Sequence, residues 1–207
     1  MNFKEKTVNH YFSRQPKAKP KFGIISTYLR GKLFEFVTST GVFSRTHIDI
    51  GTRLLIESMI LPEEGFLLDL GCGYGPVGIA AASFRPNLHV ILVDVNKRAV
   101  KLALENAKRN NVEKNVEVRH GFLYKPVENR CFDTILSNPP ISAGMKIVKL
   151  IITEAPKHLN KHGLFQIVVR SKIGGKTLRL LLENTFGNAE ILARKSGYRV
   201  FLTKKQE

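Results

Sequence analysis

The chain has 207 residues, of which 43% are hydrophobic and 24% charged, a balance that argues against a disordered protein and allows one large domain with a substantial core. Lys and Arg number 33 against 17 for Asp and Glu; the net charge of +16 favours a polyanionic partner such as nucleic acid over a membrane surface, although a generally basic proteome would give the same charge. Two cysteines, Cys72 and Cys131, form neither a disulfide framework nor a metal cage, and without an apolar signal or membrane span we expect a cytoplasmic protein.

The predicted elements begin with a basic arm and a β-hairpin. Residues 1–21 contain SRQPKAKPK and predict either a flexible arm or an extended strap over the surface. The next stretch, FGIISTYLRGKLFEFVTST, is rich in β-branched and aromatic residues on both sides of Arg30-Gly31, which predicts a hairpin that turns there. A helix is expected over about 47–60, ending before Pro62. We therefore divide the chain into an extension, residues 1–45, and a main domain, residues 46–207.

From Gly65 onward, short apolar runs alternate with helical stretches. The runs that predict strands are FLLDL (66–70), HVILVDV (89–95), VEVRH (116–120), FDTILS (132–137) and LFQIVVR (164–170). Helices are expected at about 75–84, 96–110, 143–158 and 174–185. Apolar strands separated by helices indicate a doubly wound, mostly parallel α/β sheet covered on both faces. The last segment turns at Ser196-Gly197 and predicts an antiparallel hairpin at the edge, which completes a seven-stranded sheet.

A glycine loop, LLDLGCGYGPVGIAAA, joins the first of these strands to a helix. Its glycines, Gly71, Gly73, Gly75 and Gly78, permit a tight turn and let backbone amides approach a ligand. The last three also fit the spacing of a dinucleotide site, so the loop alone does not choose a cofactor. Asp69, at the end of the strand, would repel a pyrophosphate and attract an ammonium group, which favours S-adenosylmethionine.

A second carboxylate, Asp94, lies at the carboxyl end of the next predicted strand. It can accept two hydrogen bonds from a ribose diol, which both cofactors possess, so it indicates a nucleoside without naming one. Asn96 is expected to cap the following helix, and Cys72 to be a small filler between two glycines. The structural alternative is a Gly-rich turn in which the Asp only caps.

The sequence SNPP ends the fourth strand of the sheet, at the edge where ligands of parallel sheets collect. Pro139 and Pro140 fix their own φ and push Asn138 toward an extended conformation, which makes its side chain and carbonyl a rigid pair of acceptors. Two acceptors that hold the hydrogens of an aromatic amine can turn its lone pair toward an electrophilic methyl group. The alternative is a Pro-Pro turn with Asn138 as a local cap. The chain order of Asp69, Asp94 and Asn138 favours the catalytic interpretation.

With these motifs the chain resembles the class I S-adenosylmethionine-dependent methyltransferases, and among them the group that methylates exocyclic amines with an Asn-Pro-Pro-aromatic signature. HYFS, TSTGVFSRTHIDIGTRLLI, VDVNKRAVKLALENAKRN, FDTILSNPPISAG and GYRVF extend the likeness over nearly the whole chain to the small-methyltransferase family that includes bacterial 16S ribosomal RNA guanine-N2 methyltransferases. The resemblance implies that Asp69, Gly71 and Gly73 hold the methionine end of the cofactor and Asp94 the ribose. It also implies that Asn138, with the backbone of Pro139, binds the target amine, and that GVFS borders the cofactor pocket.

Three features depart from the family pattern. Ile141 replaces the aromatic residue that stacks on the target base, which leaves weaker stacking or stacking by Phe43. Gly121 stands where many relatives carry Asp or Asn for the adenine amino group, which leaves the backbone of Phe122 for that contact. The longer relatives carry a second, inactive copy of the domain before this one, and its absence from this sequence leaves the mode of substrate docking open.

The expected enzyme transfers a methyl group to guanine N2 in 16S ribosomal RNA, as a monomer, without a metal, on RNA or the small ribosomal subunit. The candidate catalytic residues are Asn138, Pro139 and Pro140, and the candidate cofactor-binding residues are Asp69, Gly71, Gly73, Gly75, Asp94, Gly121, Phe122 and Asn138. Weaker candidates for RNA contacts, which are equally compatible with packing or a solvated surface, are His10, His47, Lys172 and Lys176.

Three alternatives remain open. An N6-adenine or protein-glutamine methyltransferase presents a planar amine to the same motif, although the net charge favours nucleic acid over protein. An RNA-binding factor with a retained cofactor site is the alternative from another class, and the intact motifs count against it. A dinucleotide-dependent oxidoreductase is supported by the spacing of the glycines alone.

Overall fold

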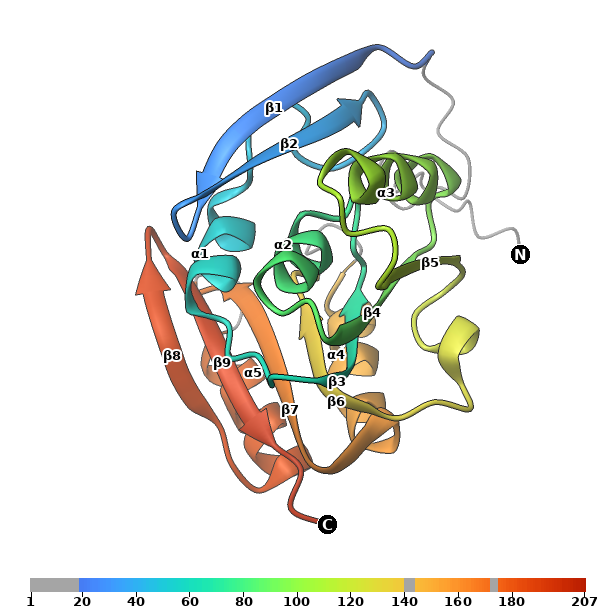
Figure 1. Cartoon of the computed structure of the whole chain (residues 1–207). Coiled ribbons are helices and arrows are strands. Elements are labelled where there is room, and N and C mark those ends of the chain that lie inside the picture. The colour runs from blue at the N-terminus through green and yellow to red at the C-terminus, as the bar shows by residue number, and fades with distance from the viewer. Residues whose placement is uncertain (1–18, 140–143, 172–174) are drawn as a thin grey trace, which may run out of the picture.

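The computed structural model describes residues 19–139, 144–171 and 175–207, which form a seven-stranded sheet with helices on both faces and a separate two-stranded hairpin (Figure 1). The hairpin strands are β1 (Phe22–Leu29) and β2 (Lys32–Ser39). The sheet strands are β3 (Gly65–Leu70), β4 (Leu88–Asp94), β5 (Val116–His120), β6 (Phe132–Ser137), β7 (Leu159–Arg170), β8 (Glu190–Lys195) and β9 (Tyr198–Lys204). The helices are α1 (Ile50–Ser58), α2 (Pro76–Phe84), α3 (Lys97–Arg109), α4 (Met145–Glu154) and α5 (Gly175–Phe186), with 3₁₀ turns at Lys125–Val127 and Ala155–His158.

The predicted topology is confirmed. The strand order is β5-β4-β3-β6-β7-β9-β8, and the first five strands run parallel because a helix or a helical crossover separates each pair. Strands β8 and β9 are joined at Ser196-Gly197, where both residues have positive φ, and they pair antiparallel at the edge. The turn at Arg30-Gly31 has the same left-handed backbone and closes the predicted hairpin.

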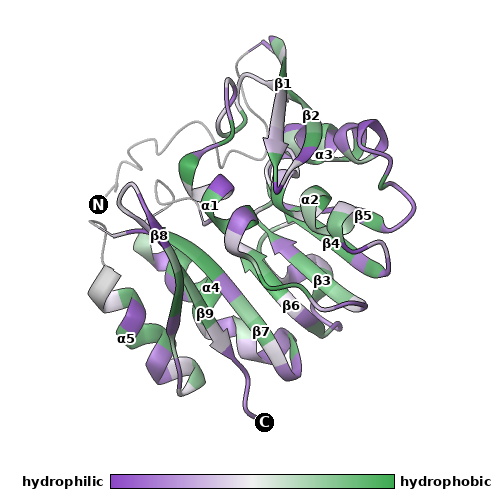
Figure 2. Ribbon diagram, turned by 60° about the vertical axis from the view of Figure 1, so that its left-hand side comes forward, coloured by the Kyte–Doolittle hydropathy of each residue, from purple (hydrophilic) through white to green (hydrophobic). Residues whose placement is uncertain are grey.

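Apolar strands place a hydrophobic core on each face of the sheet. Figure 2 shows hydrophobic residues concentrated in the central strands β3, β4, β6 and β7. In β4, Val90 and Leu92 belong to the core shared with α2 and α3, whereas Ile91 and Val93 belong to the core shared with α4 and α5. The period-2 alternation therefore fills both layers, as expected for a doubly wound sheet.

Three element boundaries differ from the sequence expectation. Helix α1 begins at Ile50 and not at 47, because the Asp49 side chain caps it by accepting hydrogen bonds from the Gly51 and Thr52 amides. The helix expected over 143–158 ends at Glu154, where a 3₁₀ turn with Pro156 in its first turn takes over. Strand β7 begins at Leu159 and not at 164, because a bulge in its pairing with β6 accommodates the extra residues.

The hairpin packs against α3 through two asparagine side chains. Asn106 Oδ1 accepts from the Val37 amide at 2.7 Å, and its Nδ2 donates to the carbonyls of Val37 at 3.0 Å and Tyr74 at 2.9 Å. One turn later, Asn110 repeats this pairing with the backbone of Glu35. On the inner face, Ile25, Leu29, Phe34 and Phe36 are buried in the core shared with α2 and α3. The helix therefore stabilises one edge of β2 much as a further strand would.

We expect Asn106→Leu to lower the free energy of unfolding by about 3 kcal/mol or more. The substitution leaves three backbone groups without the hydrogen bonds that they make with Asn106, whose side chain is 0% exposed. Asn110→Ala is the matched control: its side chain is only partly buried, and about 1 kcal/mol is expected. Urea unfolding with an unchanged m-value measures both. Equal small losses would show that the hairpin does not depend on Asn106.

Candidate functional site

The predicted site residues gather at one edge of the sheet. Asp69 and the glycine loop lie at the carboxyl end of β3, Asp94 ends β4, Gly121 follows β5 and Asn138 follows β6. These four strands are neighbours and run parallel, so their carboxyl ends meet at the same edge. The topology brings together residues that lie as much as 69 positions apart in the sequence.

The glycine loop is open on one side. The amides of Gly71 and Cys72 both donate to the Val93 carbonyl, at 2.9 and 3.0 Å, which anchors the loop to β4. Gly71 and Gly73 have φ of 76° and 58°, and a Cβ added at either would meet no atom within 4 Å. Burial raises the pKa of the Cys72 thiol, which agrees with the filler role. The open side is a cradle in which backbone can approach a ligand closely.

The other two glycines of the loop serve packing. A Cβ at Gly75 would lie 2.8 Å from Ile79 Cδ1, and a Cβ at Gly78 would lie 2.7 Å from Leu92 Cδ1. These positions let α2 pack closely on β4. A direct contact between Gly75 and a cofactor stays a prediction.

The Asp69 carboxylate is buried between β3 and α2. Its side chain is 1% exposed, and Oδ2 accepts a hydrogen bond from the Gly78 amide at 2.8 Å. Burial raises the pKa of Asp69 to about 7; the Gly78 hydrogen bond opposes the rise and the nearby Asp94 adds to it. Asp69 therefore fixes the start of α2 from a buried position, and its attraction for an ammonium group of the cofactor stays a prediction.

Asp94 holds the loop from the other side. Its Oδ2 accepts from the Gly73 amide and its Oδ1 from the Asn96 amide, both at 2.8 Å. Burial raises the pKa of Asp94, and these two hydrogen bonds are the largest opposing effects. Each carboxylate oxygen retains capacity for a further donor, so a diol remains a suitable partner. The predicted cap is confirmed, because Asn96 Oδ1 accepts from the Arg98 and Ala99 amides.

Gly121 borders the same end of β4. Its amide donates to the Asp94 carbonyl at 3.0 Å, and an added Cβ would approach Pro126 Cγ at 2.3 Å. The following Phe122 has a side chain that is 40% exposed. A side chain at 121 is thus excluded by Pro126, and the adenine contact assigned to the backbone of Phe122 stays a prediction.

The Asn138 side chain points its amide nitrogen at the first turn of α1. Nδ2 donates to Thr52 Oγ1 at 2.8 Å and to Asp49 Oδ2 at 3.3 Å. Among the described residues, none donates to Asn138 Oδ1, so this oxygen is an acceptor without a described donor. Sequence reasoning missed both partners, although they lie within the THIDIGT stretch that carried the family resemblance.

Pro139 is buried directly after Asn138. Three of the predicted residues, Pro140, Ile141 and His10, lie outside the described residues, as do Lys172 and the side chain of Lys176. His47 is exposed on the segment before α1.

The segment between the hairpin and α1 borders this edge of the sheet. The Gly41 carbonyl accepts from Asn96 Nδ2 at 2.8 Å, two residues beyond Asp94, and the same segment ends at Asp49 beside Asn138. Phe43, between these anchors, is 48% exposed. The segment that contains GVFS therefore runs from the end of β4 to the end of β6, and its place beside a cofactor pocket stays a prediction.

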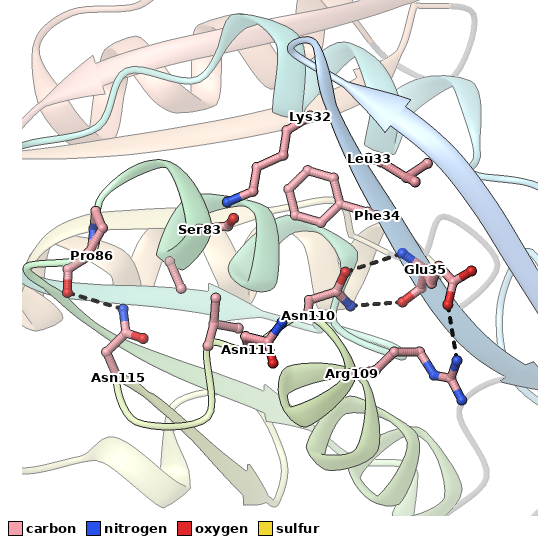
Figure 3. Close-up of a pocket in the computed structure, with 12 residues that line it drawn as sticks. Lys32, Leu33, Phe34, Glu35, Ser83, Pro86, Arg109, Asn110, Asn111 and Asn115 are labelled. Carbon is pink, nitrogen blue, oxygen red and sulfur yellow. Dashed lines mark hydrogen bonds and ion pairs between the residues drawn. The ribbon is translucent and has the colours of Figure 1, made fainter.

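A cavity of about 360 Å³ lies elsewhere, between β2 and the carboxyl ends of α2 and α3 (Figure 3). Its lining includes Lys32, Ser83, Pro86, Arg109 and Asn115. Pro86 and Asn115 precede β4 and β5, so the cavity lies at the amino ends of strands whose carboxyl ends carry the candidate site. None of the predicted catalytic or cofactor-binding residues lines it.

Within the described ranges, no group of three or more His, Cys, Asp and Glu side chains is placed to hold a metal ion. The helices in that part of the chain also lack the length and apolar character needed to cross a bilayer.

Comparison with known proteins gives a consistent result. Residues 33–202 match the sequence model of the family described as methyltransferase small domain. The uncharacterized protein YbxB of Bacillus subtilis (strain 168) is 40% identical over 198 residues, which are 95% of this chain and 98% of that protein. The ribosomal RNA small subunit methyltransferase C of Photorhabdus laumondii is 34% identical over 82% of this chain and 49% of its own length.

Among solved structures, the T. thermophilus 16S rRNA N2 G1207 methyltransferase, in complex with AdoMet and guanosine, aligns with a TM-score of 0.80 at 25% identity. The alignment covers 92% of this chain and 52% of that protein. The chain thus spans about half the length of the ribosomal RNA methyltransferases that it matches.

Proposed function

The chain belongs to the methyltransferase small domain family, and we propose that it transfers a methyl group to the exocyclic N2 of a guanine in 16S ribosomal RNA. It is an S-adenosylmethionine-dependent methyltransferase. The assignment of guanine in 16S RNA as the target is supported by relatives whose names and titles give ribosomal RNA or guanine in 16S RNA. The net charge of +16 supports a nucleic-acid substrate in general. A cytoplasmic location would follow from a ribosomal substrate.

The residues at the carboxyl edge of the sheet fit S-adenosylmethionine. Gly71 and Gly73 leave an open cradle, and Asp94 has acceptor capacity for a ribose diol. When bound, S-adenosylmethionine supplies an electrophilic methyl group on a sulfonium. In this proposal Asp94 binds the ribose, Gly71 and Gly73 border the methionine end, and Asp69 holds the loop in shape through Gly78.

The observation that carries the proposal is the orientation of Asn138. Its Nδ2 is bonded to α1, so Oδ1 is the side-chain atom left to accept a hydrogen bond from a target amine. The backbone carbonyl of Pro139 supplies the second acceptor. Two acceptors that hold both hydrogens turn the nitrogen lone pair toward the methyl donor, and the proton can leave after the nitrogen has become cationic. No strong base is needed at this site.

We propose a chain divided into an extension, residues 1–45, and a main domain, residues 46–207. The packing of the hairpin indicates how closely the two parts are joined. The family match begins at residue 33, within the hairpin. Phe34 and Phe36 share the core of the main domain, so we propose that the hairpin of the extension, residues 22–39, forms one folding unit with that domain.

Nucleoside mass spectrometry of purified 16S and 23S ribosomal RNA, from cells with and without this gene, tests the function. The expected result is the loss of one N2-methylguanosine from 16S RNA, which the gene restores and an Asn138→Ala copy does not. Loss of an N6-methyladenosine instead would identify adenine as the target. An unchanged set of modified nucleosides in both RNAs would overturn the ribosomal assignment.

A further inference from the structure

The Asn138 amide has only one favourable orientation. Asp49 Oδ2 already accepts from the Gly51 and Thr52 amides, at 2.9 and 3.2 Å, and lies 3.3 Å from Asn138 Nδ2. A carboxylate accepts hydrogen bonds and cannot donate them. If the amide were flipped, Asn138 Oδ1 would face the carboxylate oxygen, which has no proton to donate, whereas the Thr52 hydroxyl at 2.8 Å can accept or donate and so holds the side chain without choosing its orientation. The Asp49 carboxylate therefore decides which atom of the amide faces outward, and the Thr52 hydroxyl holds the side chain in place.

The turn that holds Asn138 is itself fixed by the last strand of the sheet. A Cβ at Gly51 would lie 2.9 Å from ring carbons of Tyr198 and 3.0 Å from Asp49 Oδ2, so glycine allows the β9 ring to pack directly on this turn. Burial raises the pKa of Tyr198, and the charge of the Asp49 carboxylate adds to the rise. Thr52 is 5% exposed, which shields its hydroxyl from competing water.

We propose that Asp49 and Thr52 are positioning residues, which fix the Asn138 side chain so that Oδ1 and not Nδ2 faces the target amine. The inference rests on the proposed function, because that function requires an oriented acceptor. It assigns a role to THIDIGT and to the Tyr of GYRVF, which neither the cofactor nor the target explains, and joins both to the Asn of SNPP. They meet at one point although Thr52 and Asn138 lie 86 residues apart.

Thr52→Val tests the role at constant side-chain shape, since it replaces the hydroxyl with a methyl group. We expect turnover to fall roughly 10- to 100-fold, with KM and the affinity for S-adenosylmethionine changed less than about 2-fold, because only the alignment of an acceptor is lost. Thr52→Ser keeps the hydroxyl and should recover most of the lost turnover. The matched control is Thr185→Val, which removes a hydroxyl that donates to the Leu181 carbonyl within α5.

Asp49→Ser tests the carboxylate separately from its role as a helix cap. Serine caps a helix about as well as aspartate, but its shorter side chain does not reach Asn138. Turnover should fall while the melting temperature stays close to that of the unsubstituted chain. A loss of turnover that only parallels a loss of stability would count against a positioning role.

NMR spectroscopy can detect the hydrogen bond between Asn138 and Thr52 without an activity assay. The side-chain amide signals of Asn138 are identified by their absence from the spectrum of Asn138→Ala. Thr52→Val should shift them and speed their hydrogen exchange, whereas Thr52→Ser should leave them near their original positions. Unmoved signals in Thr52→Val would overturn the inference whatever the substrate.

The turnover assays use 16S ribosomal RNA and small subunits from cells that lack the gene, with a radiolabelled methyl donor. Full turnover in Thr52→Val beside an inactive Asn138→Ala would overturn this inference alone. Full turnover in Asn138→Ala would overturn it together with the proposed mechanism.

Discussion

Replacing Asn138 with Ala is expected to abolish methyl transfer and to leave the binding of S-adenosylmethionine intact. The side chain offers one acceptor, Oδ1, and its nitrogen is already bonded to Thr52 and Asp49. Loss of a preorganised group at the reacting atom lowers turnover by roughly 10²- to 10³-fold, which would bring methyl transfer close to the background rate. A radiolabelled methyl assay measures turnover, and calorimetric titration measures cofactor affinity in the same preparation.

Asn160→Ala is the matched control for this substitution. Asn160 Nδ2 also donates to a carboxylate, Asp133 Oδ1 at 2.7 Å, but it does so within the bulged start of β7 and near the amino end of β6. Some stability should be lost there, and turnover at the permissive temperature should be retained. Retained turnover in Asn138→Ala would remove the proposed mechanism, since no other predicted residue supplies the side-chain acceptor.

The second large effect is expected at Asp94, where Ala should weaken the binding of S-adenosylmethionine by about 100-fold, close to 3 kcal/mol. Two losses add: the acceptors proposed for the ribose diol, and the hydrogen bond that holds the Gly73 amide. Asp94→Asn keeps one acceptor oxygen and should lie between the two. Calorimetric titration gives the affinities directly.

Asp133→Ala separates a general loss of stability from the loss of a ligand contact. Asp133 Oδ2 accepts from the Phe66 amide at 2.8 Å and Oδ1 from Asn160, so this carboxylate holds two donors just as Asp94 does. It lies near the opposite end of the strands, and its loss should not change cofactor affinity. Equal affinity in the Asp94→Ala and unsubstituted proteins would contradict both contributions, the ribose contact and the support of the loop.

Local sequence patterns were sufficient to predict the sheet and the edge that carries the site. Glycines after a strand, a carboxylate after the next and Asn-Pro-Pro after a third are short-range signals, and parallel topology places all of them at one edge. The same patterns do not tell how a side chain is oriented. Asp69 looked like a charge at the pocket rim, but its position in β3 turns the carboxylate toward α2, where it is 1% exposed.

The contact of Asn138 with Thr52 and Asp49 could not be predicted, because it joins residues 86 and 89 positions apart and depends on how α1 lies over the sheet. Asp49 did carry a local signal, since an Asp before a helix suggests a cap, and recognising it would also have moved the predicted start of α1 to Ile50. The bulge at the start of β7 had no comparable signal.

The hairpin leaves the ribosome before the residues that cover its inner face are made. Phe34 contacts Phe84 edge to face, Phe36 contacts Tyr74 in the same way, and the Val37 backbone waits for Asn106. During translation these aromatic rings therefore remain uncovered until Tyr74 and Phe84 have been made, and the Val37 backbone lacks its partner for 69 residues. A nascent chain that stalls in that interval would expose the apolar inner face of the hairpin to water, and chaperones could bind it there.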